Sequence, residues 1–299
     1  MDAQEQARLV APEDEIAVLD EDRAFADRSA DRKLRVEGAD AETWLHDLLT
    51  ADVAGIPPGL GRRSLLLSPT GRIRADVVVM RLAAGFVLVQ DVLQPTDIGD
   101  LLAPYVLSAA VTLTDATDDL ALYVVPEKVA GTLPWPMSRP SVVGEGSDLL
   151  VPAADAGRLA QMLRDAGLVE VGGDALEVRR IRRGVARFPT DLTERSVPAE
   201  AALEDLIDTT KGCFLGQESV AKIRNLGHPA ALVLAAQAEV EVRPGAEVLA
   251  DGVRTGLLSS AALAADGGTA CLMRVGWAAR DARFSTAAGT SLRSPRRSM

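Results

Sequence analysis

Residues Lys211 to Glu218, with the sequence KGCFLGQE, bring together side chains that could do chemistry. A thiol lies between two glycines, a lysine comes before it, and an amide and a carboxylate follow. Glycines let the backbone take unusual conformations, and a nearby ammonium favours the reactive thiolate form of cysteine. We therefore take Cys213 and Lys211 as candidate catalytic residues. The alternative, a small buried cysteine in a structural turn, stays open at this point.

The same part of the chain is also unusual in composition. The chain has four lysines, two cysteines, two histidines and one asparagine, and five of these nine residues lie between Lys211 and His228. No histidine adjoins Cys213, so a cysteine and histidine pair of the protease type has little support. Motifs for dinucleotide binding, for a phosphate-binding loop and for a zinc protease are missing from the sequence. The chemistry must therefore come from the 211–218 segment or from residues brought to it by the fold.

Composition excludes several classes of protein. A net charge of −11 and 3% aromatic residues argue against direct nucleic-acid binding, although the arginine-rich stretch 177–187 could be either a solvated helix face or an anion contact. Two cysteines can supply neither a disulfide framework nor four thiolates for a cluster or structural zinc, so we predict no metal site. The acidic N-terminus and the lack of an 18-residue apolar run predict a cytoplasmic protein without a membrane segment.

The order of predicted elements indicates an α+β fold. Strand, helix, paired strands, helix and strand follow one another, so we expect mixed sheets with helices on one face. A helix over 39–53 should carry Trp44, Leu45, Leu48 and Leu49 on one stripe, with Asp40 placed to cap it. A hairpin is predicted around the turn 68–71. After residue 230, short strands with turn signals and no helix predict a small antiparallel β-barrel or sandwich.

These patterns divide the chain into five predicted parts. They are an acidic lead-in with a short strand near its middle (1–30), a first α+β unit (31–135), a second α+β unit carrying the KGCFLGQE motif (136–229), a C-terminal β-barrel (230–290) and a disordered tail (291–299).

The extended motif KGCFLGQESVAKIRNLGH, residues 211–228, closely resembles the signature of the YgfZ family. That signature reads K-G-C-[FY]-x-G-Q-E and is followed by a V-A-R-I-x-x-x-G-H-like run. Three other stretches are also similar to family segments: RVEGADAETWLHDLLTADV (35–53), SPTGRIRADVVVMRL (68–82) and GVARFPTDLTERSVPAEAAL (184–203). Ser68 stands where many relatives have Asp. The wider group includes the glycine-cleavage T-protein and related tetrahydrofolate-dependent aminomethyltransferases and demethylases.

The resemblance implies three domains in a ring around a central hole, where tetrahydrofolate or a one-carbon derivative can bind near the motif cysteine. It implies that Asp76 contacts the folate amine, and we expect Asp76 to point into the central cavity within side-chain reach of the 211–218 loop. The cofactor-binding set implied in this way is Asp76, Asp191, Glu200, Gln217 and Glu218, and the motif loop adds Gly212, Phe214 and Gly216. Arg182 stands at a usual glutamate position that contacts the pterin, which would weaken ordinary folate recognition, because a guanidinium accepts no hydrogen bond.

Three functions follow from the resemblance. The first is a YgfZ-like folate-binding protein that supports assembly or repair of iron–sulfur enzymes, including tRNA-modifying ones, with those enzymes or their assembly factors as partners. The second is a tetrahydrofolate-dependent aminomethyltransferase or demethylase, for which Asp76 would be essential. The third is a non-catalytic interaction module with the same fold. Arg182 would favour it, because this residue would weaken ordinary folate recognition. The Cys213 motif favours the first.

Overall fold

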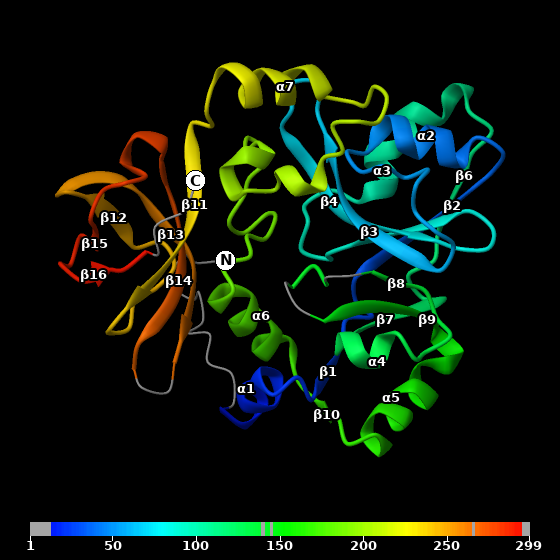
Figure 1. Cartoon of the computed structure of the whole chain (residues 1–299), viewed down its shortest axis with the longest axis horizontal. Helices are drawn as coiled ribbons and strands as arrows, with labels where there is room; N and C mark the ends of the chain where they lie inside the picture. Colours follow the sequence, from blue (N-terminus) through cyan, green and yellow to red (C-terminus); the bar gives the residue numbers. More distant parts are fainter. Residues whose placement is uncertain (1–12, 139–140, 144–145, 265–266, 295–299) are drawn as a thin grey trace.

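The structure, a computed structural model, describes residues 13–138, 141–143, 146–264 and 267–294. Figure 1 shows the elements in three groups. The C-terminal sheet lies on the left, strands β2 to β6 with helices α2 and α3 lie at the upper right, and β1, β7 and β9 with α5 lie at the lower right. Helix α6 lies between them, and α7 runs across the top toward the C-terminal sheet.

The first ten strands form one mixed sheet in the order β10-β1-β7-β9-β8-β3-β4-β5-β2-β6. The β3–β4 hairpin forms around the predicted turn, because Gly71 takes a left-handed backbone conformation there with φ of +73°. The strands are β1 (Ala24–Asp27), β2 (Arg32–Glu37), β3 (Leu60–Leu67), β4 (Ile73–Arg81), β5 (Phe86–Gln90), β6 (Thr112–Asp115), β7 (Leu120–Val125), β8 (Met137–Ser138), β9 (Ser147–Pro152) and β10 (Val169–Glu170).

Helices cover the outer faces of this sheet. Alternate β4 residues such as Val77 pack under α2 and α3, while their neighbours such as Val78 pack against Leu122 of β7 and Leu150 of β9 in the same sheet. The sheet is therefore curled. Its helical elements are α1 (Glu13–Asp20), α2 (Ala41–Leu48), α3 (Ile98–Leu102), η1 (Ala103–Ser108), α4 (Glu127–Ala130), η2 (Ala153–Asp155), α5 (Ala156–Asp165), α6 (Gly173–Arg182), η3 (Pro198–Ala201), η4 (Glu204–Leu206) and α7 (Gln217–Leu226).

The C-terminal sheet has the order β11-β14-β13-β12-β15-β16. A further bridge joins Gln237 of β11 to Arg293, the residue after β16. The elements are β11 (Ala231–Ala238), β12 (Glu247–Ala250), β13 (Val253–Leu263), β14 (Thr269–Gly276), η5 (Trp277–Ala279), β15 (Phe284–Thr286) and β16 (Ser291–Leu292).

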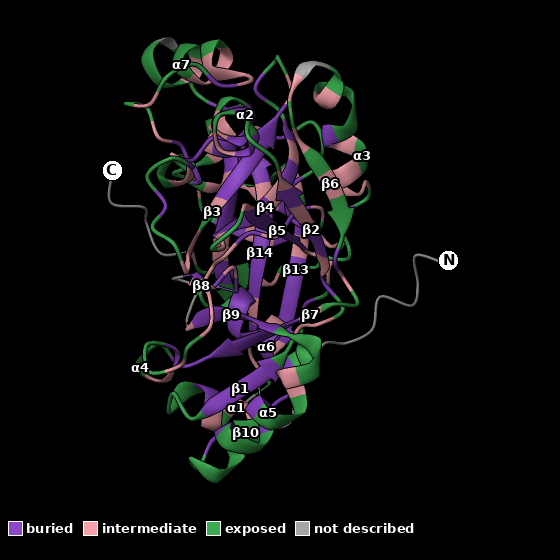
Figure 2. Ribbon diagram, turned by 90° about the vertical axis from the view of Figure 1, so that its right-hand side faces the viewer, coloured by how far each residue is buried: buried purple, intermediate pink, exposed green. Residues whose placement is uncertain are grey.

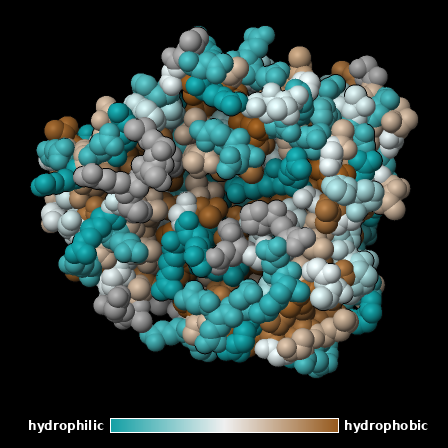
Figure 3. All heavy atoms as spheres, in the orientation of Figure 1, coloured by the Kyte–Doolittle hydropathy of each residue, from teal (hydrophilic) through white to brown (hydrophobic). Residues whose placement is uncertain are grey.

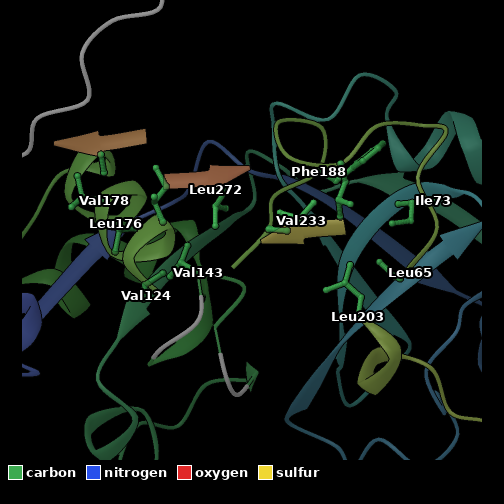
Figure 4. Packing of buried hydrophobic residues seen from close by; sticks show 14 of the residues in the cluster. Leu65, Ile73, Val124, Val143, Leu176, Val178, Phe188, Leu203, Val233 and Leu272 are labelled. Carbon is green, nitrogen blue, oxygen red and sulfur yellow. The ribbon is translucent and has the colours of Figure 1, made fainter. Parts of the chain in front are cut away.

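One apolar cluster joins the two sheets. Figure 4 shows residues of the first sheet (Leu65, Ile73), of α6 (Leu176) and of the C-terminal sheet (Val233, Leu272) in the same cluster. Figure 2 shows most strands of both sheets as buried, while β6, β10 and the outer sides of α1 and α5 are exposed. Figure 3 shows a mainly hydrophilic face with hydrophobic surface in separate patches. The α6 helix is therefore held between two layers, and the side chains that it turns inward lie at the centre of the molecule.

Three local predictions are wrong. The lead-in 1–30 contains helix α1 where a short strand was expected, and β1, which pairs with β7 and β10. Asp40 does not cap α2 with its side chain, because its carboxylate instead accepts a hydrogen bond from the Ala110 amide. The predicted disordered tail begins with β16, whose Ser291 pairs with Ser285; residues 295–299 lie outside the described part.

The predicted hairpin and the all-β C-terminal region are confirmed. The helix predicted over 39–53 is shorter, Ala41–Leu48, and Leu49 lies after its end in an extended conformation. In the described part of the chain, no helix is long and apolar enough to cross a membrane.

Candidate functional site

A cavity of about 230 Å³ lies between the inner face of the first sheet and helix α6. Most of its polar lining is charged, and acids outnumber bases. Apolar walls come from Val78, Val89, Leu176 and Phe188. The charged lining residues are Asp27, Asp31, Asp76, Asp91, Asp148, Glu177, Arg28, Arg63, Arg180 and Arg187.

Asp76, on β4, forms a two-point ion pair with Arg63 on β3. Arg63 Nε lies 2.9 Å from Asp76 Oδ1, and Arg63 Nη2 lies 2.5 Å from Asp76 Oδ2. Burial opposes the charge of Arg63, but the Asp76 carboxylate raises the pKa of the guanidinium above its usual value. Gln94 fixes the backbone of Asp76 on both sides, donating to its carbonyl at 2.6 Å and accepting from its amide at 3.1 Å. Both oxygens of Asp76 are therefore engaged within the chain.

Acidic groups gather at another part of the lining, around Arg28. Arg28 pairs with Asp31, and its Nη1 atom lies 3.5 Å from Asp148 Oδ1. This Nη1 is buried and has no hydrogen-bond partner among the described residues. Burial raises the pKa of Asp31, with Asp91 and Asp148 adding repulsion. The excess of negative charge in the cavity therefore lies here and not at Asp76.

Helix α6 supplies the opposite wall through Glu177 and Arg180, one turn apart. Arg180 donates to both oxygens of Glu177, at 2.8 and 2.6 Å, and to Asp191 Oδ2 at 2.8 Å. Burial opposes the charge of Arg180, yet these carboxylates raise its pKa. Arg187 connects this wall to Asp91, the residue after β5, at 2.6 Å.

Two of the predicted binding residues are buried structural anchors. Asp191 accepts hydrogen bonds from Arg180, the Arg187 amide, Ser259 and Ser260, and so ties α6 to β13. Glu200 is 3% exposed and pairs with Arg274 of β14 at 2.9 Å. Neither residue lines the cavity. Their role is to hold elements together: Asp191 joins α6 to β13, and Glu200 joins η3 to β14.

The motif loop is fastened to the end of α2 by Lys211. Its ammonium donates to the carbonyls of His46, Leu49 (2.6 Å) and Ala51 (2.9 Å), and it lies 5.2 Å from the centre of the Phe214 ring. Burial lowers the pKa of Lys211 to about 8, although nearby carboxylates oppose this, the largest opposing effect coming from Asp52. The expected role of Lys211 in favouring the Cys213 thiolate has no contact to support it. The ammonium instead positions the loop.

The rest of the motif divides into an exposed and a packed part. Cys213 and Gly212 are exposed, and Phe214 is buried in the apolar cluster between the sheets. Gly216 has a φ of +87° and begins the turn into α7, whose first residues are Gln217 and Glu218. Glu218 is exposed and Gln217 is half-buried. This arrangement presents the thiol at the surface.

Two features of the predicted site lie outside this cavity. No residue of 211–218 lines the cavity that contains Asp76, so the loop and Asp76 do not share it. Arg182 is also absent from its lining, since it is exposed on the other side of α6, 3.7 Å from Asp20. The position of Arg182 therefore does not favour the third function, a non-catalytic interaction module that has lost its ligand.

Of the charged cavity residues, the predicted site contained only Asp76. Glu177, Arg180 and Arg187 lie in the arginine-rich stretch 177–187, for which an anion contact was one alternative. The sequence analysis missed the others, which are Arg28, Arg63, Asp27, Asp31, Asp91 and Asp148. A signal existed for Arg63: it lies two residues along β3 from Leu65, the residue paired with Asp76, so both must point to one face.

A second, larger hollow of about 1620 Å³ lies between α7, the 197–210 segment and the C-terminal sheet. His228, the last residue of the extended motif, lies there with its ring stacked on Trp277 at 4.8 Å. Arg280 lies 4.9 Å from the same indole, so the Trp277 ring already has two partners. Among the described residues, no group of three or more His, Cys, Asp or Glu side chains could hold a metal ion.

Comparison with known proteins gives consistent results. Residues 4–131 match the family model described as the GCVT N-terminal domain. An uncharacterized protein of Haemophilus influenzae is 26% identical over 241 residues, which cover 76% of this chain and 80% of that protein. An aminomethyltransferase of Parasynechococcus marenigrum is 27% identical over 263 residues, covering 76% of this chain and 72% of the relative.

A solved structure is similar over nearly the whole chain. The glycine cleavage system aminomethyltransferase T from Bartonella henselae aligns with a TM-score of 0.78 at 21% identity, covering 95% of this chain and 88% of that one. The chain therefore has the mixed α+β fold of a glycine-cleavage aminomethyltransferase, and its N-terminal part is similar to the GCVT N-terminal domain.

Proposed function

We propose that this chain is a cytoplasmic folate-binding protein of the YgfZ type, with three domains in a ring and a C-terminal barrel. The observation that carries the folate part is a partly open cavity that contains Asp76 and whose polar lining is mostly charged, in a chain with the fold of an aminomethyltransferase. Pterin rings present several N–H donors, and the cavity offers an excess of carboxylate acceptors.

The residues present fit the ring part of tetrahydrofolate or a one-carbon derivative. At about 230 Å³, the cavity is smaller than the 300–1,000 Å³ typical of pockets that bury a whole drug-sized ligand. It therefore suits the bicyclic ring and leaves the glutamate tail outside. Asp31 offers an acceptor for N–H donors. Arg28 Nη1, which makes an ion pair of 3.5 Å with Asp148 but no hydrogen bond within the described part of the chain, offers a donor for a ring carbonyl.

The iron–sulfur part of the proposal rests on the motif. Cys213 is exposed on a loop fixed by Lys211 and Gly216, and it lies outside the Asp76 cavity. A surface thiol separate from the ligand suits contact with a partner protein. We propose iron–sulfur enzymes, including tRNA-modifying ones, or their assembly factors as these partners.

A tetrahydrofolate-dependent aminomethyltransferase is the second candidate. The names of several relatives favour it. Against it, the Asp76 carboxylate, which would have to orient the ligand amine, is already held at two points by Arg63.

Calorimetric titration with tetrahydrofolate and its methylene and formyl forms tests the folate part. We expect saturable, one-to-one binding by the wild type that is weakened by Asp31→Asn, and less so by Glu218→Gln, an exposed residue outside the cavity. No binding of any form would contradict the proposal. Aminomethyl transfer to tetrahydrofolate by the purified protein would favour the second candidate.

Complementation tests the iron–sulfur part. Cells that lack this protein and express Cys213→Ser should lose iron–sulfur enzyme activity, whereas Cys271→Ser should retain it. Full support by Cys213→Ser would remove the motif from the proposed function.

A further inference from the structure

The cavity carries its own counter-ion at Asp76. Arg63 and Asp76 lie on neighbouring strands, point to the same face and both line the cavity. Their side chains are 16% and 9% exposed, and two hydrogen bonds hold them in parallel. A two-point pair between guanidinium and carboxylate is among the strongest and most directional of side-chain contacts. A ligand cation that took the two-point position at Asp76 would have to displace Arg63.

The surroundings keep the pair in place. Gln94 clamps the Asp76 backbone from both sides, so the carboxylate cannot move away from β3. Asp148 adds a favourable Coulomb interaction with Arg63 from across the cavity. The neighbouring Arg62, by contrast, points to the other face of the sheet and is exposed.

We propose that Arg63 is the specificity-determining residue of this cavity: it occupies the position of a cationic ligand group at Asp76, so that the part of a ligand that lies beside Asp76 is uncharged. The choice of a folate ring as that ligand rests on the proposed function, but the role of Arg63 does not. The inference also explains how Asp76 can be present without orienting a ligand amine.

The test replaces the missing guanidinium with a free one. Arg63→Ala should leave an unpaired carboxylate facing a space of guanidinium size, and millimolar guanidinium chloride should then bind there. We expect a saturable rise in Tm of about 2–4 °C for this variant, measured against sodium chloride of equal ionic strength. Urea, which has nearly the same shape and no charge, should give no such rise.

Two controls isolate the pair. Arg62→Ala removes an adjacent arginine from the opposite face, and Arg63→Ala combined with Asp76→Asn removes the carboxylate as well. Neither should gain a guanidinium site, and the wild type should show none. A saturable rise in the wild type or in the double variant would overturn the proposal, as would an Arg63→Ala variant that responds equally to urea.

The reverse replacement covers the case in which Arg63→Ala does not fold. Asp76→Ala leaves the guanidinium of Arg63 unpaired, and sodium formate should raise its Tm relative to sodium chloride. If formate does not raise the Tm of Asp76→Ala, the Arg63 guanidinium does not hold a carboxylate at this position, and the proposal is wrong. A wild type that fails to bind tetrahydrofolate would sink the proposed folate function alone, because the guanidinium and formate results do not involve that ligand.

Discussion

Gly216 of the motif loop lies directly against Gly71 of the β3–β4 turn. A Cβ atom added to Gly216 would lie 3.4 Å from the Gly71 Cα atom and only 2.6 Å from the carbonyl oxygen of Ser68. The closest obstacle is backbone, so it cannot turn aside as a side chain would. The loop and the turn can meet only because both positions lack a side chain.

Gly216→Ala should therefore destabilise the protein by at least about 2 kcal/mol, because the left-handed conformation alone costs an L-residue about 1–2 kcal/mol. Urea denaturation measures this. Gly212→Ala is the matched control, since no atom lies within 4 Å of its added Cβ and its φ is not in the left-handed region. Equal stability of the two variants would show that the loop does not pack as described.

Ala202→Gly should stabilise the protein by roughly 1 kcal/mol, since Ala202 has a φ of +55°, where glycine is not strained. The shift in Tm should be about 2–4 °C for a chain of this size. Ala201→Gly, at the preceding position, has no such strain to relieve and should lower the Tm. A lower Tm for Ala202→Gly would contradict the assigned backbone conformation.

Lys211 should make the free energy of unfolding rise with pH between about 8 and 10.5. Its pKa is lowered from 10.5 to about 8 in the folded protein, so in this interval the unfolded chain binds more protons, and below it the contribution is constant. Denaturation curves at about pH 7 and about pH 10 should show the wild type gaining stability relative to Lys211→Met. Lys222→Met is the control. Because Lys222 is exposed, this variant should gain as much stability between about pH 7 and about pH 10 as the wild type does.

Cys213 should react with iodoacetamide well before Cys271. Cys213 is exposed, whereas Cys271 is 0% exposed on β14 and its burial raises its pKa to about 12. Mass spectrometry of the native protein should find a single modification, on Cys213, and both cysteines should react in denaturant. Early modification of Cys271 would contradict its place in the core.

Periodicity in the sequence predicted the elements well where one face is buried. The stripe of Trp44, Leu45 and Leu48 produced helix α2, because each of these residues is buried against the sheet. The lead-in was harder, because α1 has only one fully buried residue, Leu19, and its acidic surface resembles that of a flexible segment.

The site was predicted only in part, because its contacts join distant positions. The motif marked Lys211 and Cys213, but the partners of Lys211 lie more than 150 positions away on α2 and just after it. The direction of Arg182 depends on which side of α6 meets the cavity, and the sequence does not show that side. Arg63 carries no local signal beyond strand alternation, so its pairing with Asp76 needed the structure.

Asp191 connects parts of the molecule that must move together. Its carboxylate holds α6, the backbone at Arg187 and two serines of β13 at once. A shift of α6 that widens the cavity would therefore also move β13 of the C-terminal sheet, because the Asp191 hydrogen bonds link the two. A spectroscopic probe placed on the far side of that sheet should sense events inside the cavity, although no ligand atom comes near it.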